Sequence, residues 1–258
     1  MRRLFMPGCA LAAYDPTLTA KTAAYLKSRF PELGFVLTCC GKPTKLVGRS
    51  DLFEQRFGLL ASELEEARAD QIITACPGCL DTLGKHADAE VVSLWEVLGE
   101  IGLPPGVCGK AAGEGVEFVV HDACATRENE KVQVGVRSLI KQLGYCLNPS
   151  MIEGKNTLCC GKGGMVGASN PELSRACTHR CIEALGSTHI AVYCASCRDA
   201  FAADGAHARH LLELIWGDVV SGTDGPSAIP SPLPSLKKWR NRLKTNALLN
   251  RLQKRGSL

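Results

Sequence analysis

The chain has 258 residues, of which 45% are apolar, 5% are aromatic and 22% are charged, and its formal net charge is +4. This length and apolar fraction allow one large domain or two of about 110 to 130 residues, and they exclude disordered, collagen-like and coiled-coil proteins. The mild net charge gives no indication of a nucleic-acid partner. Fourteen residues are cysteine, so thiol chemistry is the main feature to explain.

The cysteine content and the amino terminus together indicate a reducing compartment. Secreted disulfide scaffolds are usually shorter than about 80 residues. The amino terminus imitates a signal peptide, but Pro7 and Gly8 interrupt its apolar run. No segment approaches the roughly 18 consecutive apolar residues of a membrane-spanning helix. We therefore expect a cytoplasmic protein whose thiols stay reduced unless a metal binds them.

The first half of the chain predicts alternating strands and helices. Short apolar runs predict strands over residues 3–6, 35–38 and 71–75. Apolar residues at helical spacing predict helices over residues 15–30 and 50–67. A cysteine group follows the end of each strand, and these groups are Cys9, Cys39-Cys40 and Cys76-Pro77-Gly78-Cys79.

The second half of the chain repeats this order. Strands are predicted over residues 116–120, 157–158 and 189–193, and helices over residues 128–143 and 172–185. Cysteine groups again follow the strands, as Cys124, Cys159-Cys160 and Cys194-Ala195-Ser196-Cys197. Corresponding cysteines are offset by 115 to 120 residues, which indicates an internal duplication.

Strands that alternate with helices predict an α/β fold with parallel sheets, whose ligands gather at the carboxyl ends of the strands. We therefore predict two pseudo-repeated domains, over residues 1–113 and 114–220, each collecting five cysteines at the carboxyl ends of its strands. The Gly, Ser and Pro content of residues 221–235 predicts a linker. A helix is predicted over residues 236–258.

Five thiols per copy suit an iron–sulfur cluster better than a zinc ion. A structural zinc site takes four ligands, whereas neighbouring cysteines can bind different irons of one cluster. Gly41 and Gly161 allow backbone N–H groups to approach the sulfur atoms. Lys42 and Lys162 add positive charge at equivalent positions, or are simply solvated. The alternative is a zinc-stabilised scaffold that uses only four cysteines per copy.

The two copies resemble the tandem cysteine-rich CCG domains of the catalytic iron–sulfur subunit of heterodisulfide reductases, and of related subunits of glycolate and lactate oxidases and of some quinone-linked reductases. The resemblance covers residues 1 to about 220. In heterodisulfide reductases each copy binds a noncubane [4Fe-4S] cluster, and a disulfide is reduced between the two clusters. The resemblance implies two such clusters here. Their ligands would be Cys9, Cys39, Cys40, Cys76 and Cys79 in the first copy, and Cys124, Cys159, Cys160, Cys194 and Cys197 in the second.

The chain departs from the family pattern in two ways. Many relatives carry His directly after the first cysteine of the second copy, where this chain has Ala125. His121 is a candidate to replace that proton donor, and its alternative role is structural. Asp122 is expected to cap the following helix. The ferredoxin-type cysteine clusters of the longer oxidase subunits are also missing, so we expect electrons from a separate flavin or iron–sulfur partner.

Four cysteines lie outside the two sets. Cys177 and Cys181 share one face of a predicted helix, where packing in the core is favoured over a redox pair. Cys108 and Cys146 have no pattern around them and are assigned no role.

The carboxyl-terminal segment changes the meaning of the net charge. Residues 225–258 contain eight basic residues and no acidic residue, and the remaining 22 basic and 26 acidic residues leave a charge of −4. Apolar residues recur there at helical spacing, as Leu236, Trp239, Leu243, Ala247, Leu248 and Leu252. This pattern predicts a basic amphipathic helix that contacts an anionic membrane or an acidic protein. The alternative is a helix that packs on the acidic remainder of the chain.

Taken together, these features predict an iron–sulfur oxidoreductase that passes electrons to a disulfide or a similar acceptor as part of a multi-protein complex. One alternative is a noncatalytic electron-transfer adaptor of a membrane or quinone-linked complex, and another is the zinc-stabilised scaffold. We expect a cytoplasmic location with peripheral contact at the inner face of the membrane.

Overall fold

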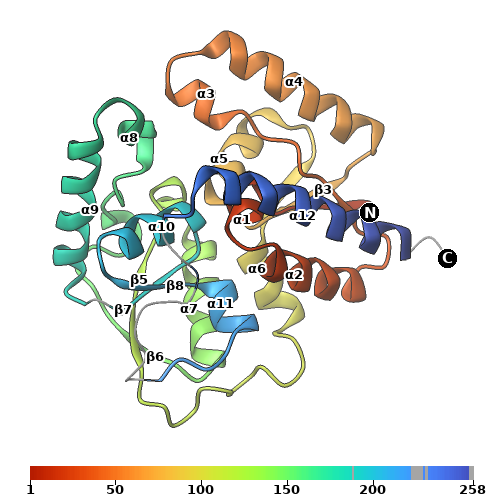
Figure 1. The fold of residues 1–258 in the computed structure, drawn as a ribbon. Helices are drawn as coiled ribbons and strands as arrows, with labels where there is room; N and C mark the ends of the chain where they lie inside the picture. Colours follow the sequence, from red (N-terminus) through yellow and green to blue (C-terminus); the bar gives the residue numbers. More distant parts are fainter. Residues whose placement is uncertain (188, 222–228, 230–231, 256–258) are drawn as a thin grey trace. The chain divides into compact units, whose positions relative to one another are not determined.

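The computed structural model describes residues 1–187, 189–221, 229 and 232–255 (Figure 1). The chain divides into two compact units, which are described separately. The first unit contains Met1–Val97 and the C-terminal segment from Leu233, and the second contains Leu98–Pro232. None of the described helices is both long and apolar enough to cross a membrane.

The first unit is built on a four-stranded parallel sheet in the order β2-β1-β3-β4. Its strands are β1 (Arg3–Met6), β2 (Gly34–Phe35), β3 (Gln71–Thr74) and β4 (Glu90–Ser93). Phe5 on β1 pairs with Phe35 on β2 and with Ile73 on β3. Phe5 and Ile73 are fully buried, as expected of central strands in a parallel sheet covered by helices.

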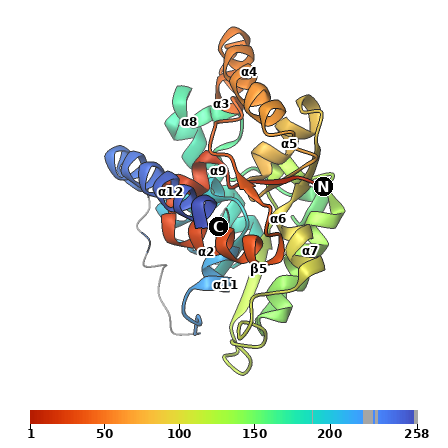
Figure 2. The ribbon, with the colours of Figure 1, turned by 90° about the vertical axis from the view of Figure 1, so that its right-hand side faces the viewer.

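Seven helices belong to the first unit or begin in it. They are α1 (Cys9–Tyr14), α2 (Pro16–Arg29), α3 (Lys42–Leu46), α4 (Ser50–Glu66), α5 (Pro77–His86), α6 (Leu94–Ile101) and α12 (Ser235–Arg255). The start of helix α2 is set by two residues. The Asp15 side chain accepts hydrogen bonds from the N–H groups of Thr17 and Leu18, and Pro16 occupies the first helical position. Both views show α12 lying alongside α1 and α2, although these helices come from opposite ends of the chain (Figures 1 and 2).

The second unit repeats this sheet, with the equivalent order β6-β5-β7-β8 and all neighbours parallel. Its strands are β5 (Glu117–His121), β6 (Cys146–Asn148), β7 (His189–Val192) and β8 (His207–His210). Its helices include α7 (Glu130–Gln142), α8 (Val166–Ser169), α9 (Pro171–Leu185), α10 (Ala195–Ala203) and α11 (Leu211–Trp216). The predicted α/β fold with two pseudo-repeated parallel sheets is therefore confirmed.

One predicted strand is wrong, and a second is shorter than expected. Residues 157–158 form no strand, and the strand that pairs with the outer side of β5 is β6. The Thr157 hydroxyl donates to the carbonyl of Asp122 at 2.6 Å, so this residue is held by its side chain. In the first unit β2 ends at Phe35, before the predicted limit of residue 38.

The division into units differs from the predicted boundaries of 1–113 and 114–220. Residues 98–113 group with the second unit, because the N–H groups of Gly109 and Ala111 donate to the carbonyls of Gln142 and Leu143 at 2.7 and 2.9 Å. Helix α12 groups with the first unit. Most of the predicted linker over 221–235, and residues 256–258 of the predicted helix, lie outside the described residues.

Candidate metal centres

Five thiols of the first unit lie in contact at the carboxyl ends of its central strands. Cys9 follows β1, and Cys76 follows β3. The thiols form a chain of hydrogen bonds in the order Cys9, Cys39, Cys40, Cys79 and Cys76. The sulfur atoms of Cys40 and Cys79 are 3.4 Å apart. Three separate cysteine groups of the sequence therefore meet at one place.

The second unit builds the same arrangement. Its thiols are connected in the corresponding order Cys124, Cys159, Cys160, Cys197 and Cys194. The pattern of burial is also the same. Cys40 and Cys79 are buried in the first unit, and Cys160 and Cys197 are buried in the second. The other three cysteines of each set are half-buried. Each unit thus combines three half-buried cysteines with a buried pair.

The closing cysteines use the amino-terminal ends of helices. Cys76 precedes the first residue of α5 and Cys194 precedes the first residue of α10, so Cys79 and Cys197 lie in the first helical turn. The positive end of a helix stabilises a thiolate. In the first unit, hydrogen bonds from the Cys79 thiol and from backbone N–H groups lower the pKa of Cys76 to about 7.

The double cysteines receive backbone hydrogen bonds from the residues that follow them. Gly41 and Lys42 donate to Cys39 and Cys40, and Gly161 and Lys162 donate equivalently to Cys159 and Cys160. Together with hydrogen bonds from the adjacent thiols, which are the larger cause, these N–H groups hold the pKa of Cys39 and of Cys159 well below the usual range. Gly161 has a φ of +85°, and a side chain there would overlap the carbonyl of Ser174. Glycine is required at this position.

Two further glycines allow the backbone to pass close to the sulfur atoms, where a side chain would not fit. A Cβ atom on Gly8 would lie 3.3 Å from the sulfur of Cys76 and 3.6 Å from that of Cys79. A Cβ atom on Gly163 would lie only 2.6 Å from the sulfur of Cys159, whose thiol also accepts the Gly163 N–H at 3.2 Å. Soft thiolate donors and nearby N–H groups fit a thiophilic metal or an iron–sulfur cluster.

Within the part of the chain that the structure describes, no three Cys, His, Asp or Glu side chains are placed to hold a single metal ion.

The two equivalent lysines have different surroundings. The Lys42 ammonium forms an ion pair with Asp81 at 2.6 Å, and its charge is one influence that lowers the pKa of Cys76. Lys162 is exposed. The lysine of the first unit is thus held by an ion pair, whereas that of the second unit is exposed.

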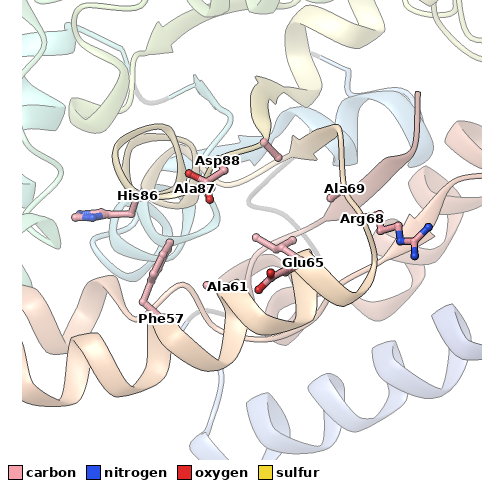
Figure 3. Close-up of a pocket in the computed structure, with 10 residues that line it drawn as sticks. Phe57, Ala61, Glu65, Arg68, Ala69, His86, Ala87 and Asp88 are labelled. Carbon is pink, nitrogen blue, oxygen red and sulfur yellow. The ribbon is translucent and has the colours of Figure 1, made fainter.

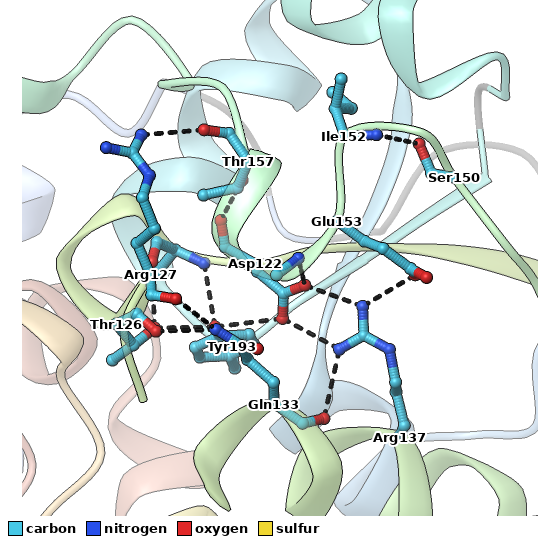
Figure 4. A network of polar contacts seen from close by, with 12 residues as sticks. Asp122, Thr126, Arg127, Gln133, Arg137, Ser150, Ile152, Glu153, Thr157 and Tyr193 are labelled. Atoms are coloured by element: carbon cyan, nitrogen blue, oxygen red, sulfur yellow. Dashed lines mark hydrogen bonds and ion pairs between the residues drawn. The ribbon is translucent and has the colours of Figure 1, made fainter. Parts of the chain in front are cut away.

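A buried polar network supports the second thiol set, and no motif of the sequence indicates it. Asp122 is fully buried and accepts hydrogen bonds from both terminal nitrogens of Arg137, at 3.0 and 2.7 Å, and from the N–H of Gly154 at 2.7 Å (Figure 4). Arg137 also contacts Glu153 at 3.0 Å. The expected role of Asp122 as a helix cap is wrong, because its carboxylate is used by Arg137, Gly154 and Tyr193.

The same network connects the segments that carry the cysteines. The Tyr193 hydroxyl donates to Asp122 at 3.3 Å and accepts the N–H of Ala123 at 3.0 Å. Asp122 and Ala123 directly precede Cys124, and Tyr193 directly precedes Cys194. At the equivalent positions the first unit has Pro7 and Ala75, so this polar support belongs to the second unit only.

The comparisons with known proteins agree with this geometry. The family described as "Cysteine-rich domain" (CCG) matches residues 4–84 and 118–202, one copy in each unit. The chain belongs to the CCG cysteine-rich domain family. An uncharacterized iron–sulfur protein of Methanococcus maripaludis, MMP1067, is 28% identical over 166 residues, which cover 62% of this chain and 32% of that protein. The chain thus matches about a third of the length of this relative.

The similarity to one solved structure is too low to support a conclusion about this chain. The aspartate racemase homologue PH1733 of Pyrococcus horikoshii is 14% identical, with 98% of this chain and 100% of that chain covered, but the TM-score is 0.32.

His121 lies in the interior of the second CCG domain. Its Nε2 is 3.1 Å from the carbonyl oxygen of Leu158, and its ring packs edge-on against Phe201. Burial lowers the pKa of His121. These contacts are those of a structural residue, and the proposal that His121 donates a proton gains no support from them.

The cysteines outside the two sets have different environments. Cys181 is fully buried in the core that also contains Cys160 and Cys197, and burial raises its pKa to about 12. Cys177 is half-buried, and Cys108 and Cys146 are exposed.

A cavity of about 350 Å³ lies away from the thiols of the first CCG domain. It is bordered by Phe57, Glu65 and Arg68 on one side and by His86 and Asp88 on the other, and no cysteine lines it (Figure 3). The thiol sets, rather than this cavity, are the candidate functional sites.

Replacing Gly163 by Ala is expected to empty the second CCG site. The new methyl group would occupy space beside the sulfur of Cys159, so bound metal per chain should fall by about half, as measured by elemental analysis. Gly84→Ala is the matched control, because nothing lies within 4 Å of its Cβ position. It should keep its full metal content and gain roughly 0.5–1 kcal/mol of stability. Equal metal content in both variants would refute the assignment of Gly163.

Replacing Asp122 by Asn is expected to destabilise the second unit by roughly 3 kcal/mol, because Arg137 loses its buried counter-charge. Urea unfolding followed by circular dichroism measures this change. Glu153→Gln removes the exposed partner of the same arginine and should cost less than about 1 kcal/mol. If the two variants unfold alike, the Asp122 network does not support this unit.

Proposed function

We propose that the chain is an iron–sulfur electron-transfer protein in which each set of five cysteines holds one noncubane [4Fe-4S] cluster. The observation that carries this proposal is the identical order of thiol contacts in the two CCG domains. The name of the Methanococcus relative adds support. A bound cluster supplies one-electron chemistry.

The residues of each site have separable tasks under this proposal. The buried pair, such as Cys40 and Cys79, excludes water from one side of the site. The half-buried cysteines, such as Cys9, are the ligands through which electrons would leave the cluster toward an acceptor. Backbone N–H groups, such as that of Gly41, offset the negative charge of the thiolates.

The proposed reaction is the reduction of a disulfide or a similar acceptor, with electrons from a flavin or iron–sulfur partner protein. Cleaving a disulfide consumes two electrons and two protons and yields two thiols, and two one-electron sites in one chain match this requirement. The second candidate is a noncatalytic electron-transfer adaptor. Both place the protein in the cytoplasm, where thiols stay reduced.

Anaerobic purification followed by iron and acid-labile sulfide analysis tests the cluster proposal. We expect about eight iron atoms per chain, together with visible absorbance. Zinc without sulfide would contradict the proposal and support the scaffold alternative.

Reoxidation of the chemically reduced protein separates catalysis from electron relay. A disulfide that restores the oxidised visible spectrum and releases two thiols supports the reductase. If a set of small disulfides leaves the protein reduced while an electron-accepting dye or quinone oxidises it, the catalytic proposal is wrong and the adaptor is favoured.

We further propose that the outward face of α12 contacts an anionic membrane surface. Leu236, Trp239 and Leu243 are 67%, 56% and 51% exposed, and Arg240 and Lys244 beside them are exposed as well. Tryptophan and leucine flanked by basic residues are typical of helices that lie at a membrane surface. The opposite face of α12 packs on the first unit, so the predicted single apolar face is divided between two surfaces.

Vesicle sedimentation tests this contact. The protein should bind vesicles that contain phosphatidylglycerol and not vesicles of pure phosphatidylcholine. Trp239→Ala combined with Leu243→Ala should reduce binding at least tenfold, whereas Leu173→Ala, which changes another half-exposed leucine, should not. Equal binding by all variants, or capture of an acidic protein by this face instead of lipid, overturns the proposal.

A further inference from the structure

Helix α12 is attached to the helix that begins with Cys9. The Asn241 side chain donates to the carbonyls of Ala13 and Tyr14, at 2.8 and 3.3 Å. The Thr245 hydroxyl donates to the carbonyl of Ala12 at 2.9 Å. Thr245 is fully buried. These contacts join residues more than 220 positions apart in the chain.

The carbonyls that α12 contacts belong to the last turn of α1. Helix α1 has six residues, and the last four carbonyls of a helix have no acceptor role within it. By supplying donors from Asn241 and Thr245, α12 satisfies three of them. The orientation of α1, and therefore of Cys9 at its start, depends on this contact.

Helix α12 also brings a positive charge to the first thiol set. Arg242 donates through Nε to the carbonyl of Cys9 at 3.3 Å. Its charge acts to lower the pKa of Cys9, against the larger effects of the Cys39 thiol and of burial. The strongest influences on the pKa of Cys124, the equivalent residue, are neighbouring thiols and burial, and all of them raise it. The two sites thus differ in their nearby charge.

Helix α12 also lines a cavity next to the double cysteine of this site. A cavity of about 340 Å³ is lined by Leu37 and Thr38, which directly precede Cys39, and by Asn246, Leu249 and Asn250 of α12. Leu249 is buried. Helix α12 therefore adjoins two of the three cysteine-bearing segments of the first unit.

We infer that α12 completes the first cysteine site, and that Arg242 makes the cluster held there easier to reduce than it would be without this charge. Reduction adds negative charge to a cluster, and a nearby cation, here the exposed Arg242, favours the reduced form. The inference on reduction rests on the proposed function, whereas the attachment of α1 by α12 does not.

Hydrogen–deuterium exchange of the purified protein tests the attachment, whether or not a cluster is bound. Thr245→Val removes the hydroxyl donor and keeps the shape of the side chain. The peptide that covers residues 9–14 should exchange at least tenfold faster in this variant, and the β3 peptide should be unchanged. Unchanged exchange in residues 9–14 would show that α12 does not hold α1.

A potentiometric titration followed by electron paramagnetic resonance tests the charge. Cys9→Ser first identifies the signal of the first site, because that signal should be lost. Arg242→Gln should then shift the midpoint potential of this signal to a more negative value and leave the second signal in place. Arg242→Lys should retain most of the original potential.

Arg251→Gln is the matched control, since it removes an exposed charge from the same helix nine positions away. It should leave both potentials unchanged. If Arg242→Gln and Arg251→Gln have the same effect, the specific role of Arg242 is wrong even when iron and sulfide are present. If neither metal nor sulfide is found, it is the proposed function that fails.

Discussion

Five thiols in mutual contact are the constraint on which each unit depends. They cannot all ionise together, because each thiolate raises the pKa of its neighbours, as seen for Cys9 and Cys124. Neighbouring thiols are instead linked through their protons by hydrogen bonds. A metal centre would replace those protons with positive charge, so binding would release protons and strengthen the same contacts.

The two units meet this constraint with different supports. In the second unit a buried aspartate and arginine join the segments around Cys124 and Cys194, and the tyrosine that precedes Cys194 completes the connection. In the first unit the equivalent positions are Pro7 and Ala75, which have no side-chain hydrogen bonds to offer. There a helix from the other end of the chain supplies the polar contacts instead. The duplicated halves therefore share the arrangement of their thiols and the order of their strands. They differ in the polar contacts that support the cysteine-bearing segments.

Much of this could be predicted from the sequence, because the cysteine spacing and the strand–helix alternation are local patterns that repeat. The positions of β1, β3, β5 and β7 follow from short apolar runs, and the five cysteines of each copy do meet. The edge strands β2 and β6 are harder to predict. They have two and three residues, which are too few for a periodic signal. The role of Asp122 depends on Arg137, Gly154 and Tyr193, and no local pattern connects those positions. The place of α12 is hard to predict for a similar reason, because Leu236, Trp239 and Leu243 are exposed while Leu249 of the same helix is buried.

The return of α12 to the first unit has a consequence for the order of assembly. Every strand of the second unit, and all five of its clustered cysteines, lie between the two parts of the first unit in sequence. A ribosome therefore releases the whole sheet of the second unit before Asn241, Arg242 and Thr245 emerge. The first unit, whose strands are synthesised first, is therefore the unit whose chain is completed last.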